Sequence, residues 1–195
     1  SNLMEEVARY AMVAGTIAMT RKGDFDVIHA HDWLTYMAGI AAKRLSGKPL
    51  VVHVHATSFD RSSDQNIDTR VYDIEKRGME AADKVITVSD LTRNIVITKY
   101  GIDPSKVITV HNAVDFSGRS EVNVERGVKD KVVTFLGRIT FQKGPEYFIE
   151  AAAKVLKRCD NVRFVMAGSG DMMNRSIRQV ARLGISDRFH FTGFL

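Results

Sequence analysis

The feature that most constrains the fold of this chain is a regular alternation between short apolar, β-branched runs and longer amphipathic segments. Seven runs are predicted to be strands, at residues 26–30, 50–55, 84–88, 107–111, 131–137, 162–168 and 189–193. Six segments carry helical periodicity, at residues 4–22, 35–46, 65–82, 90–100, 144–158 and 171–183. Strands that alternate with helices imply right-handed βαβ crossovers and a mostly parallel sheet. The runs are apolar at nearly every position, which predicts helices on both faces of the sheet.

One polar stretch, residues 115–129, interrupts this alternation and has no clear periodicity. It predicts two α/β halves: residues 1–116 as the C-terminal part of one domain, 117–130 as a linker, and 131–195 as the N-terminal part of a second domain. Four predicted strands precede the linker and three follow it, fewer than a complete doubly wound domain contains. The chain also ends directly after a predicted strand. We therefore expect an α/β fold of two Rossmann-like parallel-sheet halves, both truncated, from a larger two-domain protein.

Charge and composition exclude several classes of function. The net charge is +5, but the basic residues are scattered and form no concentrated stripe, so we expect no nucleic-acid partner. No run of eighteen apolar residues occurs, so we expect no membrane span. Cys159 is the only cysteine, which rules out an internal disulfide and predicts a reducing, cytoplasmic location. A small anionic ligand such as a nucleotide stays open.

Polar residues gather directly after the predicted strands of the first half. The segments are HAHDW at residues 29–33, HVHATSFDR at 53–61, Ser89, and His111 with Asn112. In parallel α/β sheets, ligands bind beyond the carboxyl ends of the strands. The pattern therefore predicts one site along that edge of the first sheet.

A metal site is the obvious alternative, because five of the six histidines lie in this half. His29 and His31 are two residues apart, as are His53 and His55, and we expect the members of each pair to point to opposite faces of the sheet. No cysteine or glutamate is placed to help them bind an ion. The sequence therefore predicts no metal site, and it predicts that His29 and His53 are ordinary hydrogen-bonded strand residues.

The second half carries an anion-binding pattern. Gly137 and Arg138 follow its first predicted strand, and Lys143 stands just before the next helix. Fixed cations beside a helix N-terminus favour a phosphate group, and a diphosphate fits that field. Two solvated cations on a loop are the plainer explanation. Gly168 and Gly170 follow the next strand, but Met173 occupies the place of a third glycine, so a dinucleotide fingerprint is incomplete.

Together these segments resemble the glycogen-synthase-like, retaining glycosyltransferases of family 4, which have two Rossmann domains in the GT-B arrangement. The matching pieces are HAHDW (29–33), VVHVHATSFDRS (51–62), EKRGMEAADKVITVSDLTRNIV (75–96), VHNAVD (110–115), FLGRITFQKGPEYFIEA (135–151), VMAGSGD (165–171) and FHFTGF (189–194). They cover nearly the whole chain, in order. The resemblance implies transfer of a hexose, with glucose from ADP- or UDP-glucose favoured, to a carbohydrate acceptor such as an α-glucan.

The resemblance also implies roles for particular residues. The catalytic set is His55, Arg138 and Lys143. Donor binding falls to Gly137, Arg138, Lys143, Gly168, Gly170, Gly193 and Phe194. The acceptor side holds Asp32, Thr57 and Asp60. Two fixed cations can neutralise the departing diphosphate in the transition state, so neither a metal nor a cofactor is expected beside the nucleotide sugar.

Two pieces of the family pattern are missing, the glycine-rich N-terminal loop and the E-x7-E segment expected after residue 195. The chain alone is therefore predicted to be inactive. A non-catalytic nucleotide-binding module is the main alternative. A nucleotide-sugar epimerase on the same scaffold is a weaker one, since the candidate acid and base carboxylates on the cleft side are mainly Asp32 and Asp60. A family-typical mechanism would have the leaving phosphate accept the acceptor's proton, so no dedicated base is required.

Overall fold

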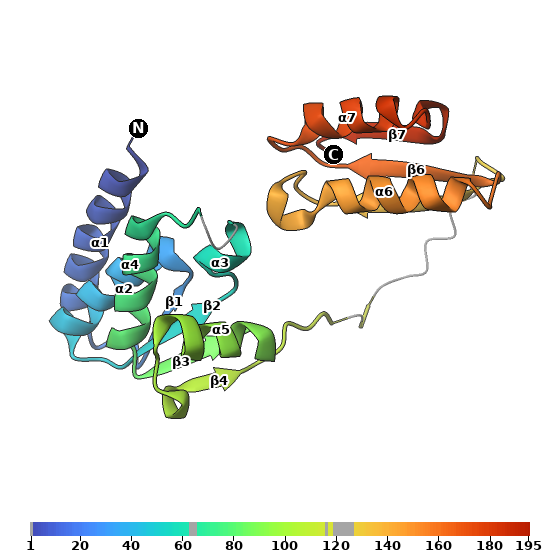
Figure 1. The fold of residues 1–195 in the computed structure, drawn as a ribbon. Helices are drawn as coiled ribbons and strands as arrows, with labels where there is room; N and C mark the ends of the chain where they lie inside the picture. Colours follow the sequence, from blue (N-terminus) through green and yellow to red (C-terminus); the bar gives the residue numbers. More distant parts are fainter. Residues whose placement is uncertain (1, 63–65, 116, 119–126) are drawn as a thin grey trace. The chain divides into compact units, whose positions relative to one another are not determined.

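The computed structural model describes residues 2–62, 66–115, 117–118 and 127–195. The chain divides into two compact units, Ser1–Asp115 and Phe116–Leu195, each with its own sheet (Figure 1). We call them unit 1 and unit 2. Most of the predicted linker, residues 119–126, lies outside the described residues.

Unit 1 is a four-stranded parallel sheet with helices in the crossovers. Its elements are α1 (Leu3–Thr20), β1 (Ile28–His31), α2 (Trp33–Ser46), β2 (Leu50–Val54), α3 (Ser58–Arg61), α4 (Thr69–Ala81), β3 (Lys84–Thr87), α5 (Asp90–Tyr100) and β4 (Val107–Thr109). The strands lie in the order β1-β2-β3-β4, and every neighbouring pair is parallel. The fold-class prediction is confirmed here.

The core of unit 1 lies on one face of this sheet. Ala30, Val52, Val54, Val85 and Val107 are buried there. They pack against α2, α4 and α5 through a second set of buried side chains: Tyr36, Ile40, Met79, Val96 and Tyr100. The alternate strand residues, on the other face, are half-buried or exposed. The expectation that helices cover both faces is therefore not met among the described residues of unit 1.

Local signals set several helix ends in unit 1. Gly47 and Gly101 end α2 and α5 in the left-handed conformation, with φ of 74° and 72°. Glycine reaches that conformation without the steric penalty that a Cβ brings. The Ser89 hydroxyl accepts from Thr92 N at 3.1 Å and so caps α5. Ser89 therefore serves the helix that follows it.

Unit 2 is a three-stranded parallel sheet in the order β5-β6-β7. Its elements are β5 (Lys131–Leu136), α6 (Pro145–Leu156), β6 (Val162–Ala167), α7 (Met173–Arg182) and β7 (Phe189–Gly193). Short 3-10 turns at Phe141–Lys143 and Ser186–Arg188 precede α6 and β7. Ile139, Ile149, Met166, Met172 and Val180 form its main buried cluster. Among the described residues no helix has the length and apolar character needed to cross a membrane.

Candidate functional site

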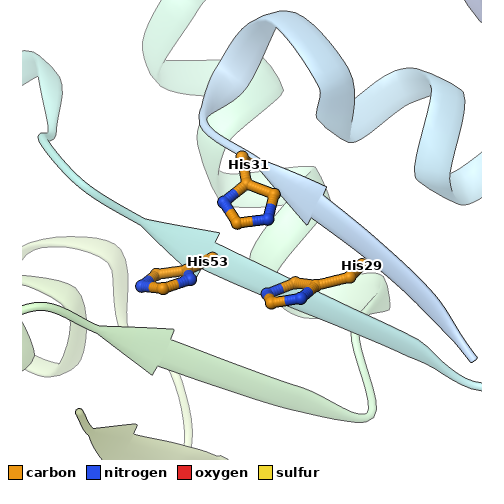
Figure 2. Close-up of side chains that lie close together, drawn as sticks. All are labelled: His29, His31 and His53. Carbon is orange, nitrogen blue, oxygen red and sulfur yellow. The ribbon is translucent and has the colours of Figure 1, made fainter. Parts of the chain in front are cut away.

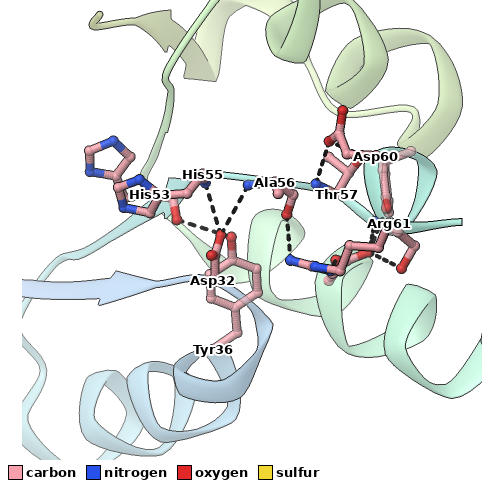
Figure 3. Close-up of polar contacts among 11 residues, drawn as sticks. Asp32, Tyr36, His53, His55, Ala56, Thr57, Asp60 and Arg61 are labelled. Carbon is pink, nitrogen blue, oxygen red and sulfur yellow. Dashed lines mark hydrogen bonds and ion pairs between the residues drawn. The ribbon is translucent and has the colours of Figure 1, made fainter. Parts of the chain in front are cut away.

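Asp32 organises the carboxyl end of the first sheet. It is the one non-glycine residue with a positive φ among the described residues, at 56°, and it stands between β1 and α2. Its Oδ1 accepts hydrogen bonds from His55 N at 2.8 Å and Ala56 N at 3.4 Å, while its own N–H donates to His53 O at 3.0 Å (Figure 3). One strained residue thereby holds the turn that follows β2.

The His55 ring meets His31 directly. His55 Nε2 and His31 Nδ1 are 3.0 Å apart, so one nitrogen donates and the other accepts according to the tautomers. Both side chains are exposed at the end of the sheet. The structure therefore brings the predicted residues Asp32 and His55 together and adds His31, to which no role was given from the sequence.

Thr57 and Asp60 support the same turn from inside. The Asp60 carboxylate accepts from Thr57 N at 2.6 Å and from Thr57 Oγ1 at 2.8 Å, in a capping box at the start of α3. Thr57 is 1% exposed, and its hydroxyl is engaged by the Asp60 carboxylate. Both residues are therefore placed to position the backbone beside His55.

Behind this turn lies a buried polar network centred on Glu75, which was not predicted. Glu75 Oε2 accepts from Ser58 Oγ at 2.7 Å and from Tyr100 Oη at 2.5 Å, and its Oε1 pairs with Arg61 at 2.7 Å. Glu75 is 3% exposed, so its charge depends on these partners. Burial and the Glu75 hydrogen bond raise the pKa of Tyr100 far above its ordinary value. The network ties α3, α4 and α5 together.

The histidine geometry corrects the expectation that each pair points to opposite faces. Ring centroids lie 4.3 Å apart for His29 and His31, and 4.2 Å apart for His53 and His55. Side chains along a strand alternate with a period of two, so residues two apart share a face. The register pairs His31 with His53 on the adjacent strand. All four rings therefore gather on one face of the sheet.

A pocket of about 520 Å³ lies at the carboxyl ends of the strands of unit 2. Its lining residues are Leu136, Gly137, Arg138, Thr140, Ala167, Gly168, Ser169, Gly170, Phe194 and Leu195. The predicted donor-site residues Gly137, Arg138, Gly168, Gly170 and Phe194 are thus brought together. No site role was predicted for Leu136, Thr140, Ala167, Ser169 and Leu195. The volume is that of a small-molecule or cofactor site.

Backbone contacts draw the turns around this pocket close together. Gly137 N donates to Ala167 O at 3.0 Å, Ile139 N to Ser169 O at 2.9 Å, and Gly168 N to Gly193 O at 2.8 Å. A Cβ on Gly168 would lie 2.0 Å from Gly137 O, and one on Gly170 would lie 2.2 Å from Ile139 O. Only glycine fits at either position, so the pattern at 168–170 has a steric cause in the shape of the pocket.

The two predicted cations differ in placement. Arg138 lines the pocket and is exposed. Lys143 ends the turn Phe141–Lys143 before α6, is also exposed, and is not among the lining residues. Within the part of the chain that the structure describes, neither side chain forms an ion pair. Both side chains can therefore bind an anion, and only Arg138 lies on the pocket lining.

Sequence comparison matches each unit to a family profile. Residues 5–117 match the family described as Glycosyltransferase Family 4, and residues 119–195 match Glycosyl transferases group 1. An uncharacterized glycosyltransferase of Methanocaldococcus jannaschii is 33% identical over 184 residues, which are 88% of this chain and 47% of that protein. D-inositol 3-phosphate glycosyltransferase 2 of Catenulispora acidiphila is 30% identical over 92% of this chain and 47% of its own length. The chain thus spans about half the length of these relatives.

Solved structures share the fold. The Anabaena protein HepE in complex with UDP-glucose superposes with a TM-score of 0.77 at 22% identity, over 95% of this chain and 51% of that one. Sucrose-phosphate synthase of Thermosynechococcus elongatus gives a TM-score of 0.68 at 18% identity, over 88% of this chain and 46% of that one. At such identities the likeness concerns the fold.

Proposed function

The chain belongs to glycosyltransferase family 4, and from this membership we propose that the whole protein transfers a hexose from a nucleotide-diphosphate sugar to a carbohydrate acceptor. The hexose that we propose is glucose, and the acceptor an α-glucan, because the HAHDW and HATSFDRS segments resemble those of glycogen and starch synthases. We further propose that the transfer retains the anomeric configuration and needs no metal at the reacting centre.

The observation that carries this proposal is the glycine-built pocket of unit 2, with Arg138 on its lining. Breaking the bond between the sugar and the diphosphate gives an oxocarbenium-like sugar and a leaving group that gains negative charge. A cation that is fixed before the reaction stabilises the charge developing in the transition state more than the ground state. Arg138 is proposed to grip the diphosphate with its fork of donors, and Lys143 to add a second charge from the start of α6.

On the acceptor side we propose that His55 contacts the transferred sugar and that Asp32 positions it. The Asp32 carboxylate holds the His55 backbone N–H, and the His55 ring is exposed beside His31. Thr57 and Asp60 are proposed to keep the same turn in place through their capping box. The proton of the acceptor hydroxyl passes to the leaving phosphate, so none of these side chains is assigned as a base.

The decisive test is a transfer assay on the whole protein with UDP-glucose and ADP-glucose, in which NMR assigns the anomer of the product. Arg138→Ala and Lys143→Ala should each lower kcat by roughly 10²- to 10³-fold, as loss of one preorganised donor does. Arg182→Ala, which removes an exposed cation of α7 outside the pocket lining, serves as the control and should leave the rate unchanged.

Calorimetry on this chain with UDP, ADP and GDP separates binding from transfer. Binding that Arg138→Ala weakens, together with transfer by the whole protein, supports the proposal. Binding without any transfer would instead indicate a nucleotide-binding module. Unchanged transfer rates in both cation variants would refute the roles given to Arg138 and Lys143.

A further inference from the structure

Three histidines on one face of the first sheet form a cluster to which the proposed transfer reaction gives no role. His29 and His31 lie on β1, and His53 lies beside them on β2 (Figure 2). One ring nitrogen from each of these three side chains lies within 4.8 Å of the other two. The rings of His29 and His53 stack with centroids 5.4 Å apart and planes 3° from parallel. Nitrogen atoms of three imidazoles thus lie close to one another.

The side chain of His53 lacks hydrogen-bond partners in this cluster. Both of its ring nitrogens are buried, and among the described residues neither has a hydrogen-bond partner. This contradicts the expectation that His53 is an ordinary hydrogen-bonded strand residue. Buried polar atoms in native proteins almost always have a partner, so an unpaired imidazole calls for an explanation such as an ion.

Neighbouring contacts prepare the other rings for the same role. The bond between His31 Nδ1 and His55 Nε2 fixes the orientation of the His31 ring and leaves its Nε2 available. Histidines that bind metals usually hold their second ring nitrogen in such a hydrogen bond.

The donor set indicates which ion fits. Three neutral imidazoles without thiolate are typical of zinc, which accepts three histidines and leaves its fourth tetrahedral position to water. Bonds of about 2.0–2.1 Å to zinc would bring the nitrogens to about 3.4 Å from one another. The nitrogens now lie within 4.8 Å of one another, so binding requires the exposed His29 and His31 rings to rotate toward His53. The Asp32 carboxylate is engaged by the backbone at residues 55 and 56 and stays outside the set.

We propose that His29, His31 and His53 form a zinc-binding site on the exposed face of unit 1, with His55 orienting His31. This site is separate from the donor pocket, which lies in unit 2. An ion here would link β1 to β2 and hold the strand ends that lead to Asp32 and His55. Its role is therefore structural or regulatory.

Isothermal titration of this chain with ZnCl₂ tests the site directly. One zinc per chain should bind with micromolar affinity or tighter. His55→Ala should weaken binding by roughly 10- to 100-fold, the usual effect of losing a group that orients a ligand. The double variant His31→Ala/His53→Ala loses two ligands and should weaken it by more than about 100-fold. His190→Ala, which removes an exposed histidine of β7, is the matched control and should bind zinc as the wild type does.

A second measurement uses the unaltered chain, so it does not depend on whether the variants fold. With one equivalent of Cu²⁺ as the probe, electron paramagnetic resonance should show hyperfine coupling to imidazole nitrogens. A spectrum with oxygen ligands only would overturn the proposal. Zinc affinity that is unchanged in a folded double variant, as judged by circular dichroism, would overturn it as well.

Discussion

At the scale of single residues, Asp32 shows how a conformational penalty and a functional position coincide. Asp32 combines a positive φ of 56° with an extended ψ of 170°, a conformation that is unfavourable for any residue with a Cβ. The penalty is offset because the carboxylate accepts two backbone N–H groups of the turn after β2. The residue that the family resemblance places at the floor of the site is therefore also the one that joins β1 to the His55 turn.

Replacing Asp32 tests that link. Asp32→Ala should lower the free energy of unfolding of unit 1 by about 2–4 kcal/mol, because it loses both accepted hydrogen bonds and keeps the strained backbone. Asp32→Asn retains an oxygen acceptor on a side chain of the same shape, so its loss should be about 1 kcal/mol. Trp33, the only tryptophan, lies beside Asp32 and reports urea unfolding of this unit by fluorescence. Equal losses in the two variants would contradict the role of the carboxylate oxygen.

Gly168 offers a second test at this scale. Gly168→Ala places a Cβ against Gly137 O in a backbone conformation with φ of 139°. The clash and the strain together should lower the free energy of unfolding by about 2–4 kcal/mol, measured by thermal unfolding followed by circular dichroism. The same substitution should abolish UDP binding. Gly184→Ala has a φ of 67° but open space around its Cβ, so only the strain of about 1–2 kcal/mol should appear. If both variants are equally stable, the turns around the pocket can move apart.

At the scale of elements, the strands and helices were largely predictable because the apolar periodicity is strong. The predicted strand 189–193 and helix 90–100 coincide with β7 and α5. The predicted helix 65–82 begins later, at Thr69, because Asp68 caps it, and the short α3 was missed because four residues carry no periodicity. Part of the pocket of unit 2 was predictable from the glycines that follow its strands, because the steric need for glycine in a tight turn is a local property of the sequence.

The histidine cluster could not be predicted in the same way. Period-two alternation places His29 and His31 on one face, and the opposite assumption was wrong. The proximity of His31 to His53, however, depends on the register between β1 and β2, which is set by tertiary packing. The Glu75 network has the same origin, because its members come from three helices, α3, α4 and α5, that only the tertiary fold brings together.

That network gives a prediction about how α4 and α5 are held together. Tyr100→Phe removes a buried hydrogen bond to the Glu75 carboxylate and should destabilise unit 1 by about 1.5–3 kcal/mol in urea unfolding. Tyr72→Phe is the matched control, because its exposed hydroxyl bonds to Lys99 O and its ring stacks on Tyr100. The control should change stability by about 0.5 kcal/mol or less. If Tyr100→Phe leaves the free energy of unfolding unchanged, the other hydrogen-bond donors around the Glu75 carboxylate are sufficient without the tyrosine hydroxyl.

Asp83 predicts how the contact between α2, β2 and the start of β3 responds to acid. Its Oδ2 accepts from Lys43 Nζ at 2.8 Å and Leu50 N at 2.7 Å, and these bonds lower its pKa below the usual 3.8. The unfolded state then binds the proton more readily, so the stabilisation is present above pH 3.8 and is lost as the pH falls through the folded-state pKa. Since the side chain is half exposed, the effect is about 1 kcal/mol or less. Asp83→Asn should reduce the slope with which the free energy of unfolding falls as the pH drops below 3.8. An unchanged slope would contradict this role of Asp83.

At the scale of the whole molecule, the proposals assign different ligands to different units. Unit 1 carries the histidine cluster and the Asp32 turn, and unit 2 carries the glycine-built pocket. Each unit has its own buried core, so a ligand acts first on the unit that binds it. A ligand at 100 times its Kd stabilises the state that binds it by about 2.7 kcal/mol, enough to slow local opening measurably.

Hydrogen exchange followed by mass spectrometry on the intact chain can resolve these effects. UDP should protect amides in residues 137–144 and 168–172, and zinc should protect amides in residues 29–31 and 53–56. Arg138→Ala should abolish only the protection by UDP, while His31→Ala/His53→Ala should abolish only the protection by zinc, because each variant removes groups from one unit. Protection by zinc that persists in His31→Ala/His53→Ala would contradict the proposed zinc site and would leave the proposal for the donor pocket unaffected. Protection by UDP that is unchanged in Arg138→Ala would contradict the role of Arg138 in the donor pocket and would leave the zinc site unaffected. The two proposals can therefore fail independently.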